Sequence, residues 1–165
     1  MKRLVVWLLL LLTAFALRAT APDWDGGIAA HPDERFLLGA AEATPVMGNV
    51  CRAFPNFPYG HLPIVLAQLL SAAAPEADSL FAARLLSSLV GVALVALTGA
   101  CAASVGGEYA GFLAGLLAAL SPGLIQQAHF YTVDPIGAAF ASAAALTATR
   151  GRWRFSGALV GLAVA

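Results

Sequence analysis

The fold class is decided by residues 81–105, FAARLLSSLVGVALVALTGACAASV. A helix needs roughly 20 apolar residues to cross the ~30 Å hydrocarbon core of a bilayer, and this run exceeds that length with Arg84 as its one charged residue. The chain of 165 residues is 60% hydrophobic and 11% charged, with a mean hydropathy of +0.81. Ordinary soluble domains are only ~45–50% apolar. The sequence therefore predicts an integral membrane protein.

Further apolar runs predict an all-α, polytopic transmembrane protein. We expect spans at about 4–21, 81–105, 109–126 and 133–149, and an incomplete fifth at 155–165. The last run is shorter than the roughly 20 residues that a span needs, so we expect one membrane domain that is the amino-terminal fragment of a longer protein. The first run also fits a signal peptide cut after Ala21. Pro22 would follow that cut directly, which favours an uncleaved anchor.

Small residues recur every four positions along two of these runs. Gly107, Gly111 and Gly115 have this spacing, and Gly99 and Ala103 have it on the preceding run. Such stripes let helices approach closely in lipid. We therefore expect the two runs to pack as an antiparallel pair, joined by a tight turn around Gly107.

Basic residues predict the orientation. Lys2 and Arg3 precede the first run, and Arg150, Arg152 and Arg154 lie between the last two. Because positive residues stay on the cytoplasmic side, we expect a multi-pass protein of the cell inner (plasma) membrane with a cytoplasmic N-terminus. The large first loop, residues 22–80, then faces the outside or the periplasm. Charges confined to the ends of apolar runs give no support to nucleic-acid binding.

Seven of the nine acidic residues fall in this outer loop. Pro32 suits the first turn of a helix, where its missing N–H costs nothing, and Asp33 and Glu34 then complement the positive helix end. We predict one helix from Pro32 to about Ala43 and a second over 62–74, both interfacial or, for the second, re-entrant. The prolines between them predict an extended backbone over 52–61.

Two acidic sites have both a structural and a functional interpretation. Asp33 and Glu34 fit a catalytic carboxylate pair, or first-turn residues that stabilise a helix end by ~0.3–1 kcal/mol each. Asp134, which precedes Pro135, fits an ordinary N-cap. The run 136–149 covers only about 21 Å at ~1.5 Å per residue, so Asp134 is expected at or below the outer membrane surface. A carboxylate there needs a partner, a cation or water.

Three other residues are candidates for binding. Arg84 fits contact with an anionic headgroup or a substrate phosphate, and equally a side chain that extends to the interface. His129 fits a phosphate or metal ligand, or an interfacial polar residue. Tyr59 belongs to an aromatic cluster that fits a binding wall or an interfacial belt. No nucleotide-binding glycine loop, serine triad or clustered metal-ligand spacing appears, and Cys51 and Cys101 suggest no disulfide.

Several weak motifs follow one another in an order that resembles a known family. They are the Asp-Glu helix start at 33–34, FPNFPYGHLP at 54–63, ARLLS at 83–87, LSP at 120–122 and HFYTVD at 129–134. In this order they resemble the amino-terminal part of GT-C membrane glycosyltransferases. More narrowly, the chain is similar to glycosyltransferase family 39, which contains protein O-mannosyltransferases and the aminoarabinose transferases of lipid A. The resemblance covers nearly the whole chain.

The resemblance implies a glycosyltransferase that moves a sugar from a polyprenyl-phosphate carrier to a lipid, glycan or protein acceptor on the outer side of the membrane. It implies that Asp33 is the general base, that Glu34 assists by polar contact, and that Asp134 positions the donor or a divalent cation. Arg84 and His129 are weaker candidates for contacting the donor phosphate, and Tyr59 for the substrate. Members of the family carry many more spans, so this piece alone is expected to be inactive.

A non-enzymatic membrane component is the alternative. It would be a transporter or an assembly partner that uses the acidic outer loop for binding. A reading frame that continues into further spans would favour the enzyme, and termination near Ala165 would favour the partner.

Overall fold

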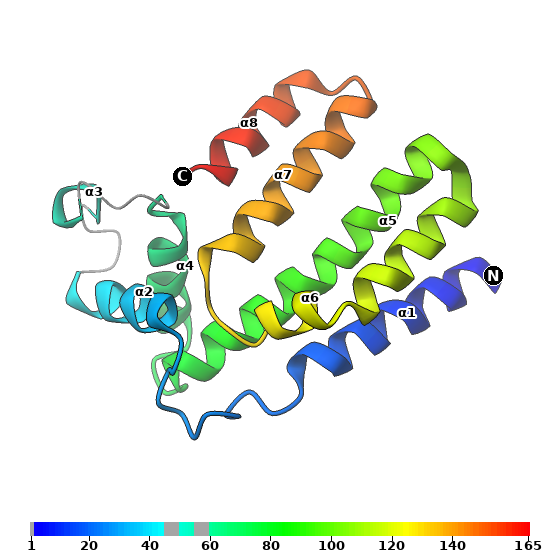
Figure 1. Ribbon diagram of the computed structural model, residues 1–165. Helices are drawn as coiled ribbons and strands as arrows, with labels where there is room; N and C mark the ends of the chain where they lie inside the picture. The colour runs from blue at the N-terminus through cyan, green and yellow to red at the C-terminus, as the bar shows by residue number, and fades with distance from the viewer. Residues whose placement is uncertain (1, 45–49, 55–59) are drawn as a thin grey trace.

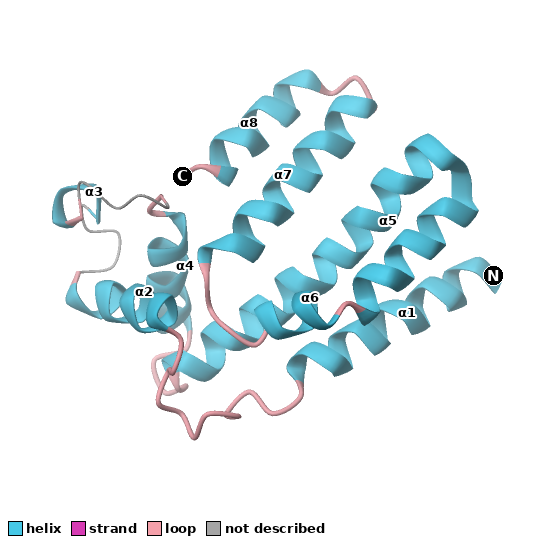
Figure 2. Ribbon diagram, viewed as in Figure 1, coloured by secondary structure: helices cyan, strands magenta, loops and turns pink. Residues whose placement is uncertain are grey.

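The computed structural model describes residues 2–44, 50–54 and 60–165. Within these ranges the chain is all-helical and no strand occurs (Figure 2), which confirms the predicted all-α class. The helices are α1 Lys2–Ala19, α2 Pro32–Ala43, α3 Val50–Ala53, α4 Leu62–Ala73, α5 Ser79–Leu120, α6 Pro122–Gln127, α7 Val133–Thr149 and α8 Trp153–Ala163.

Among the described residues, α5 is the one helix long and apolar enough to cross a membrane. Its 42 residues are interrupted at Gly107, where φ is 77° and ψ is −177°. Glycine adopts a positive φ without the steric penalty of a Cβ. The chain reverses at this residue, so that α5 has two arms lying beside one another (Figure 1). The predicted tight turn is confirmed, and the multi-pass arrangement stays a prediction.

The two arms of α5 touch where small residues face each other. A Cβ on Gly99 would lie 3.0 Å from the carbonyl oxygen of Gly111, and one on Gly111 would lie 2.7 Å from the Cβ of Ala103. The Trp7 ring of α1 packs against the same point, since a Cβ on Gly99 would also meet it. The predicted close packing of an antiparallel pair is therefore confirmed at these residues.

Most helix bounds follow the sequence prediction. The bounds of α2 and α7 are those predicted, and α4 ends one residue before the predicted position. The predicted span 109–126 is wrong beyond Leu120. Ser121 is extended, with φ −65° and ψ 117°, because a residue before proline avoids the helical region. Pro122 then begins a separate short helix, α6.

The helix α2 packs on protein along part of its apolar face. Leu37, Ala40 and Ala41 are buried in one core with Ile64 and Ala67 of α4. Phe36 on the same helix is 44% exposed, and the interfacial position of α2 stays a prediction.

The extended backbone predicted over 52–61 is also wrong in part. Arg52 and Ala53 belong to the helical turn α3. Tyr59 lies outside the described residues, so its predicted place in a binding wall has no structural counterpart here.

The predicted cytoplasmic and outer segments lie toward different ends of the molecule. In Figure 1 the N-terminus, the bend of α5 at Gly107 and the turn between α7 and α8 lie toward the right. The helices α2, α3 and α4 lie toward the left. The basic residues Arg150 and Arg152 therefore lie far from the acidic start of α2.

Candidate functional site

A buried guanidinium forms the centre of the site. Arg84, in the first arm of α5, is 1% exposed. Its Nε and Nη2 donate to the two carboxylate oxygens of Glu34 at 2.9 and 2.7 Å. Its Nη1 and Nη2 donate to those of Asp25 at 2.9 and 2.7 Å, and Nη1 also donates to the carbonyl of Pro22 at 2.6 Å. A guanidinium has five N–H groups, so every donor of Arg84 is used.

The segment before α7 joins this arrangement. The backbone N–H of Tyr131 donates to Glu34 Oε1 at 2.9 Å, and the Tyr131 hydroxyl donates to the carbonyl of Pro63 at 2.6 Å. Burial raises the pKa of the Tyr131 phenol above its ordinary value, so the hydroxyl keeps its proton and remains a donor. We call Asp25, Glu34, Arg84 and Tyr131 the Arg84 junction. It ties the α1–α2 loop, α2, α5 and the segment before α7 together.

Asp25 is strongly stabilised as a carboxylate. Hydrogen bonds from Arg84 hold the pKa of Asp25 well below its ordinary value, against the opposing effect of burial, and the N–H groups of Ala30 and Gly27 add to the lowering. The Trp24 ring also faces the guanidinium, with Arg84 Cζ 5.6 Å from the ring centroid. The α1–α2 loop is thus anchored by a charged, two-bond contact at Asp25.

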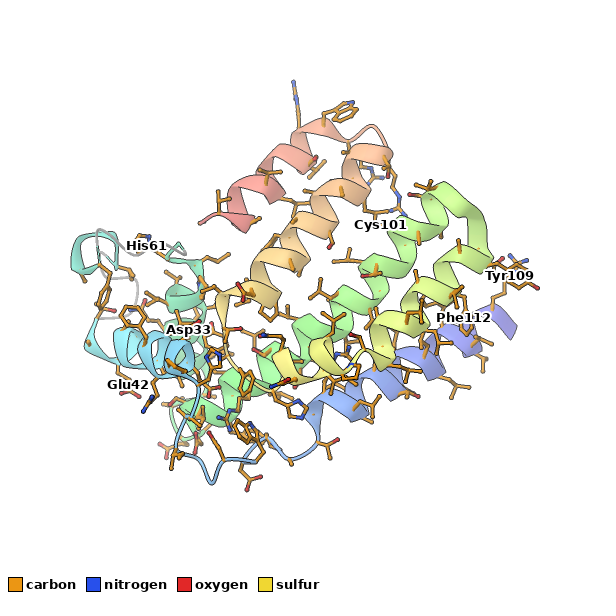
Figure 3. The ribbon with its side chains drawn as sticks, viewed as in Figure 1. Asp33, Glu42, His61, Cys101, Tyr109 and Phe112 are labelled. Carbon is orange, nitrogen blue, oxygen red and sulfur yellow. The ribbon has the colours of Figure 1, made fainter. Side chains whose placement is uncertain are left out.

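Asp33 and Glu34 are adjacent in sequence but lie in opposite environments. Successive residues of a helix are turned by about 100°. Glu34 therefore lies on the face of α2 that holds Leu37 and Ala41, and it is 0% exposed. Asp33 is exposed in the first turn of the helix; Figure 3 labels it. They do not form a cooperating pair, because Glu34 is bound to Arg84 and Asp33 is exposed.

The His31–Phe36 segment and the 129–134 motif meet in the structure. The His31 and Phe130 rings lie 4.8 Å apart between centroids, and Phe130 and Trp24 lie 5.5 Å apart. His31 is the N-cap of α2, and its Nδ1 accepts from the N–H of Asp33 at 3.3 Å. Together with the bond between Tyr131 and Glu34, these contacts bring the segment before α7 to the start of α2.

Asp134 occupies the first turn of α7, and the prediction that it is the N-cap is wrong. The N-cap is Thr132, so Asp134 and Pro135 already lie inside the helix. The Asp134 side chain is exposed and lines a cavity of about 120 Å³ between α5, α6 and α7, with Gly91 and Ala138 among the other lining residues.

The two cationic candidates for a substrate phosphate are already engaged. All five Arg84 donors are taken by the junction. His129 Nδ1 lies 2.8 Å from the carbonyl oxygen of Ile125, and Nε2 lies 3.0 Å from that of Thr20. Neither side chain is therefore placed to bind a phosphate in this structure. Within the described ranges, no group of three His, Cys, Asp or Glu side chains could hold a metal ion, including around Asp134.

Sequence reasoning missed two residues that organise the structure. Asp25 carries no motif of its own, and only its place in the acidic loop marked it. Arg18 is 1% exposed and donates from Nη1 and Nη2 to the carbonyls of Ala119 and Ala118 at the end of α5. Ser88 donates back to the carbonyl of Arg18 at 2.8 Å. The signal available in the sequence for Arg18 was its position, as a lone cation at the end of the first apolar run.

Comparison of the chain with protein-family models, curated proteins and solved structures gave no match.

Proposed function

We propose that this chain belongs to a membrane glycosyltransferase that moves a sugar from a polyprenyl-phosphate carrier to an acceptor on the outer side of the membrane. The observation that carries the proposal is the exposed Asp33 carboxylate beside the Arg84 junction. A general base has to reach its substrate, while its backbone has to be held still. Asp33 meets the first requirement by its exposure, and the junction meets the second through Glu34.

Asp33 is the general base in this mechanism. The acceptor hydroxyl passes its proton to the Asp33 carboxylate while its oxygen attacks the anomeric carbon of the donor. The bond from that carbon to the phosphate oxygen breaks, the phosphate leaves with the bonding electrons, and the anomeric centre inverts.

Glu34, Arg84 and Asp25 are positioning residues in the same proposal. Arg84 holds one carboxylate from the α1–α2 loop and one from α2, so it fixes the loop relative to the helix start. Bidentate Arg–carboxylate pairs restrict geometry more than single hydrogen bonds do. Removing a member of the junction should therefore affect catalysis through the position of Asp33.

The charge distribution supports the proposed orientation. The acidic residues of α2 and the basic turn between α7 and α8 lie toward opposite ends of the molecule (Figure 1). In the inner (plasma) membrane, basic segments stay in the cytoplasm. Asp33 then faces the side on which polyprenyl-linked sugars are transferred in the family that the chain resembles.

The first test replaces Asp33 by Asn in the product of the complete reading frame. We expect transfer from polyprenyl-phosphate sugars to fall by about 10²–10⁴-fold, the usual contribution of a general base. Membrane insertion and thermal stability should stay near wild type, because Asp33 is exposed. Transfer would be measured with a radiolabelled donor in membranes.

Glu42→Gln is the matched control, since Glu42 is an exposed carboxylate in the last turn of the same helix (Figure 3). It should transfer sugar at the wild-type rate. Wild-type transfer by Asp33→Asn would remove the catalytic role. A wild-type protein that transfers no polyprenyl-linked sugar would favour the non-enzymatic alternative, a transporter or an assembly partner.

A further inference from the structure

A cavity of about 420 Å³ lies between the α1–α2 loop and α6. It is separate from the Arg84 junction and from the smaller cavity at Asp134. Its size falls in the ~300–1,000 Å³ range of ligand pockets, which combine apolar and aromatic walls with a few polar groups. The lining residues are Trp24, Pro122, Ile125, Gln126, His129 and Phe130.

Aromatic rings connect this cavity to Asp33. Trp24 is 47% exposed, and its ring meets Phe130 edge to face at 72° and 5.5 Å. Phe130 also lies against the His31 ring at 35° and 4.8 Å. His31 accepts the N–H of Asp33 at 3.3 Å. A ligand in the cavity would therefore lie beside a row of three rings, and the last ring, His31, is bonded to the backbone of the residue that carries the exposed carboxylate.

The chemistry of the lining favours a neutral, hydroxylated ring. Among the described residues, no lysine or arginine lines the cavity, and both ring nitrogens of His129 already face carbonyl oxygens. The Arg84 guanidinium lies 5.6 Å from the centroid of the Trp24 ring, but its N–H donors are all used in the Arg84 junction. A phosphate would therefore find no free cationic donor among these residues. The exposed Gln126 amide offers two N–H donors and a carbonyl acceptor, which suit hydroxyl groups. Aromatic faces carry partial negative charge and attract the positively polarised C–H face of a sugar ring.

We propose that this cavity is the subsite for the sugar that the carrier delivers, with Trp24 and Phe130 as its stacking wall and Gln126 as its hydroxyl partner. The inference rests on the proposed function. An isoprenoid chain is the other occupant to consider, but it would leave the Gln126 amide unpaired. A sugar held there has its carrier phosphate outside the cavity and its reacting carbon toward the aromatic row that leads to Asp33.

A binding experiment distinguishes the two occupants. The chain has three tryptophans, at positions 7, 24 and 153. In the full-length protein Trp7 and Trp153 would be replaced by Phe, so that Trp24 alone of these three remains. Its fluorescence would be titrated in nanodiscs with short prenyl phosphates that carry a hexose or an aminopentose, and with the bare prenyl phosphate. We expect a saturable change with at least one sugar-bearing donor and none with the bare carrier. An equal change with the bare carrier would assign the cavity to the lipid and overturn the proposal.

A kinetic experiment tests the same subsite by comparing the KM for the sugar donor with the Ki of the bare prenyl phosphate. Trp24→Leu should raise the KM for the donor about tenfold, change kcat less than twofold and leave the Ki of the bare prenyl phosphate unchanged. Trp24→Phe, which keeps an aromatic face, should recover most of the affinity. If KM and Ki rise together, Trp24 contacts the carrier, and the cavity is not a subsite for the sugar.

Two further variants keep the test decisive. Gln126→Leu, at an exposed position, should raise the donor KM severalfold even if Trp24→Leu fails to fold. Trp153→Leu is the matched control, because Trp153 is 71% exposed at the start of α8, beyond the far end of α7, and its KM should stay at the wild-type value. Sugar transfer with unchanged KM in both Trp24→Leu and Gln126→Leu would refute the subsite alone. An absence of transfer in the wild type would refute the proposed function instead.

Discussion

At the scale of single residues, Asp33 and Glu34 show how one helical step separates an exposed from a buried carboxylate. Glu34 shares its face with Leu37 and Ala41, three and seven positions later, and that face is covered by α4 and α5. A buried carboxylate is tolerated because Arg84 and the Tyr131 amide satisfy it. Asp33 has no such enclosure and stays exposed, as the proposed role of general base requires.

Glu34→Gln should therefore destabilise the protein far more than Asp33→Asn. Removing one partner of a buried ion pair costs about 3–5 kcal/mol, whereas an exposed first-turn carboxylate contributes about 0.3–1 kcal/mol. Thermal unfolding in detergent, followed by circular dichroism, would show a much lower Tm for Glu34→Gln. Equal Tm values for the two variants would mean that Glu34 contributes no more to stability than Asp33 does.

The Arg84 junction also predicts a pH dependence. Because Arg84 lowers the pKa of Asp25 in the folded state, the unfolded chain takes up a proton at Asp25 near its ordinary pKa of about 4 while the folded protein does not. The stability from this carboxylate is thus fully present above about pH 4 and is lost as the pH falls below that value. We expect the Tm difference between wild type and Asp25→Asn to shrink on acidification from pH 6 to pH 3. A constant difference would contradict the lowered pKa.

The partners of Arg84 could not be predicted from the sequence. An arginine near the end of an apolar run indicates that some acceptor lies nearby, but Glu34 and Asp25 are 50 and 59 positions away and share no pattern with it. The burial of Glu34 did leave a local signal, its helical spacing to Leu37. The aromatic row through Phe130 left none, because its rings come from separate segments.

At the scale of helices, proline and glycine account for both the successes and the failure of prediction. Pro32 marked the start of α2, and Gly107 marked the reversal in α5. The break at Ser121 was missed because the apolar pattern continues on both sides of it, and hydrophobicity alone does not register the backbone restriction that Pro122 imposes. The packing of α2 on α4 was missed since an apolar face looks the same whether lipid or protein covers it.

Gly99→Ala should weaken the contact between α1 and the two arms of α5. The added Cβ would meet the Trp7 ring and the carbonyl oxygen of Gly111, and overpacking of this kind costs typically about 1–3 kcal/mol. Unfolding in detergent would be compared with Gly161→Ala in α8, where an added Cβ meets nothing within 4 Å. The control should keep the wild-type Tm. No loss of Tm in Gly99→Ala would show that the helices are not in close contact there.

At the scale of the whole molecule, the charge distribution is the one that the proposed orientation requires. The N-terminal Arg3 pairs with Glu108 at 2.8 Å, beside the bend of α5, and the basic turn before α8 lies toward the same end (Figure 1). The acidic loop and α2 lie toward the other end. In a membrane, this separation matches the positive-inside rule, which places the basic end in the cytoplasm.

Cysteine labelling tests this orientation. In a protein with Cys51 and Cys101 replaced by Ser, we would introduce Asp23→Cys in the α1–α2 loop and, separately, Arg152→Cys in the α7–α8 turn, both at exposed positions. An impermeant maleimide should label the first variant in intact cells and the second only after lysis. The reverse pattern would invert the proposed topology.

The Arg84 junction also has a consequence for biosynthesis. Tyr131, the last member to be made, follows Glu34 by 97 residues. At a synthesis rate of ~5–20 residues per second, Tyr131 is made roughly 5–20 s after Glu34. Glu34 lacks the hydrogen bond from the Tyr131 N–H until then. During this interval the α1–α2 loop, which lies on the translocated side in the proposed topology, is without its complete anchor and open to proteases and chaperones. The Arg84 junction is therefore complete only after the segment before α7 has been made and has packed against α2. Protease resistance of the α1–α2 loop would then be a direct measure of assembly.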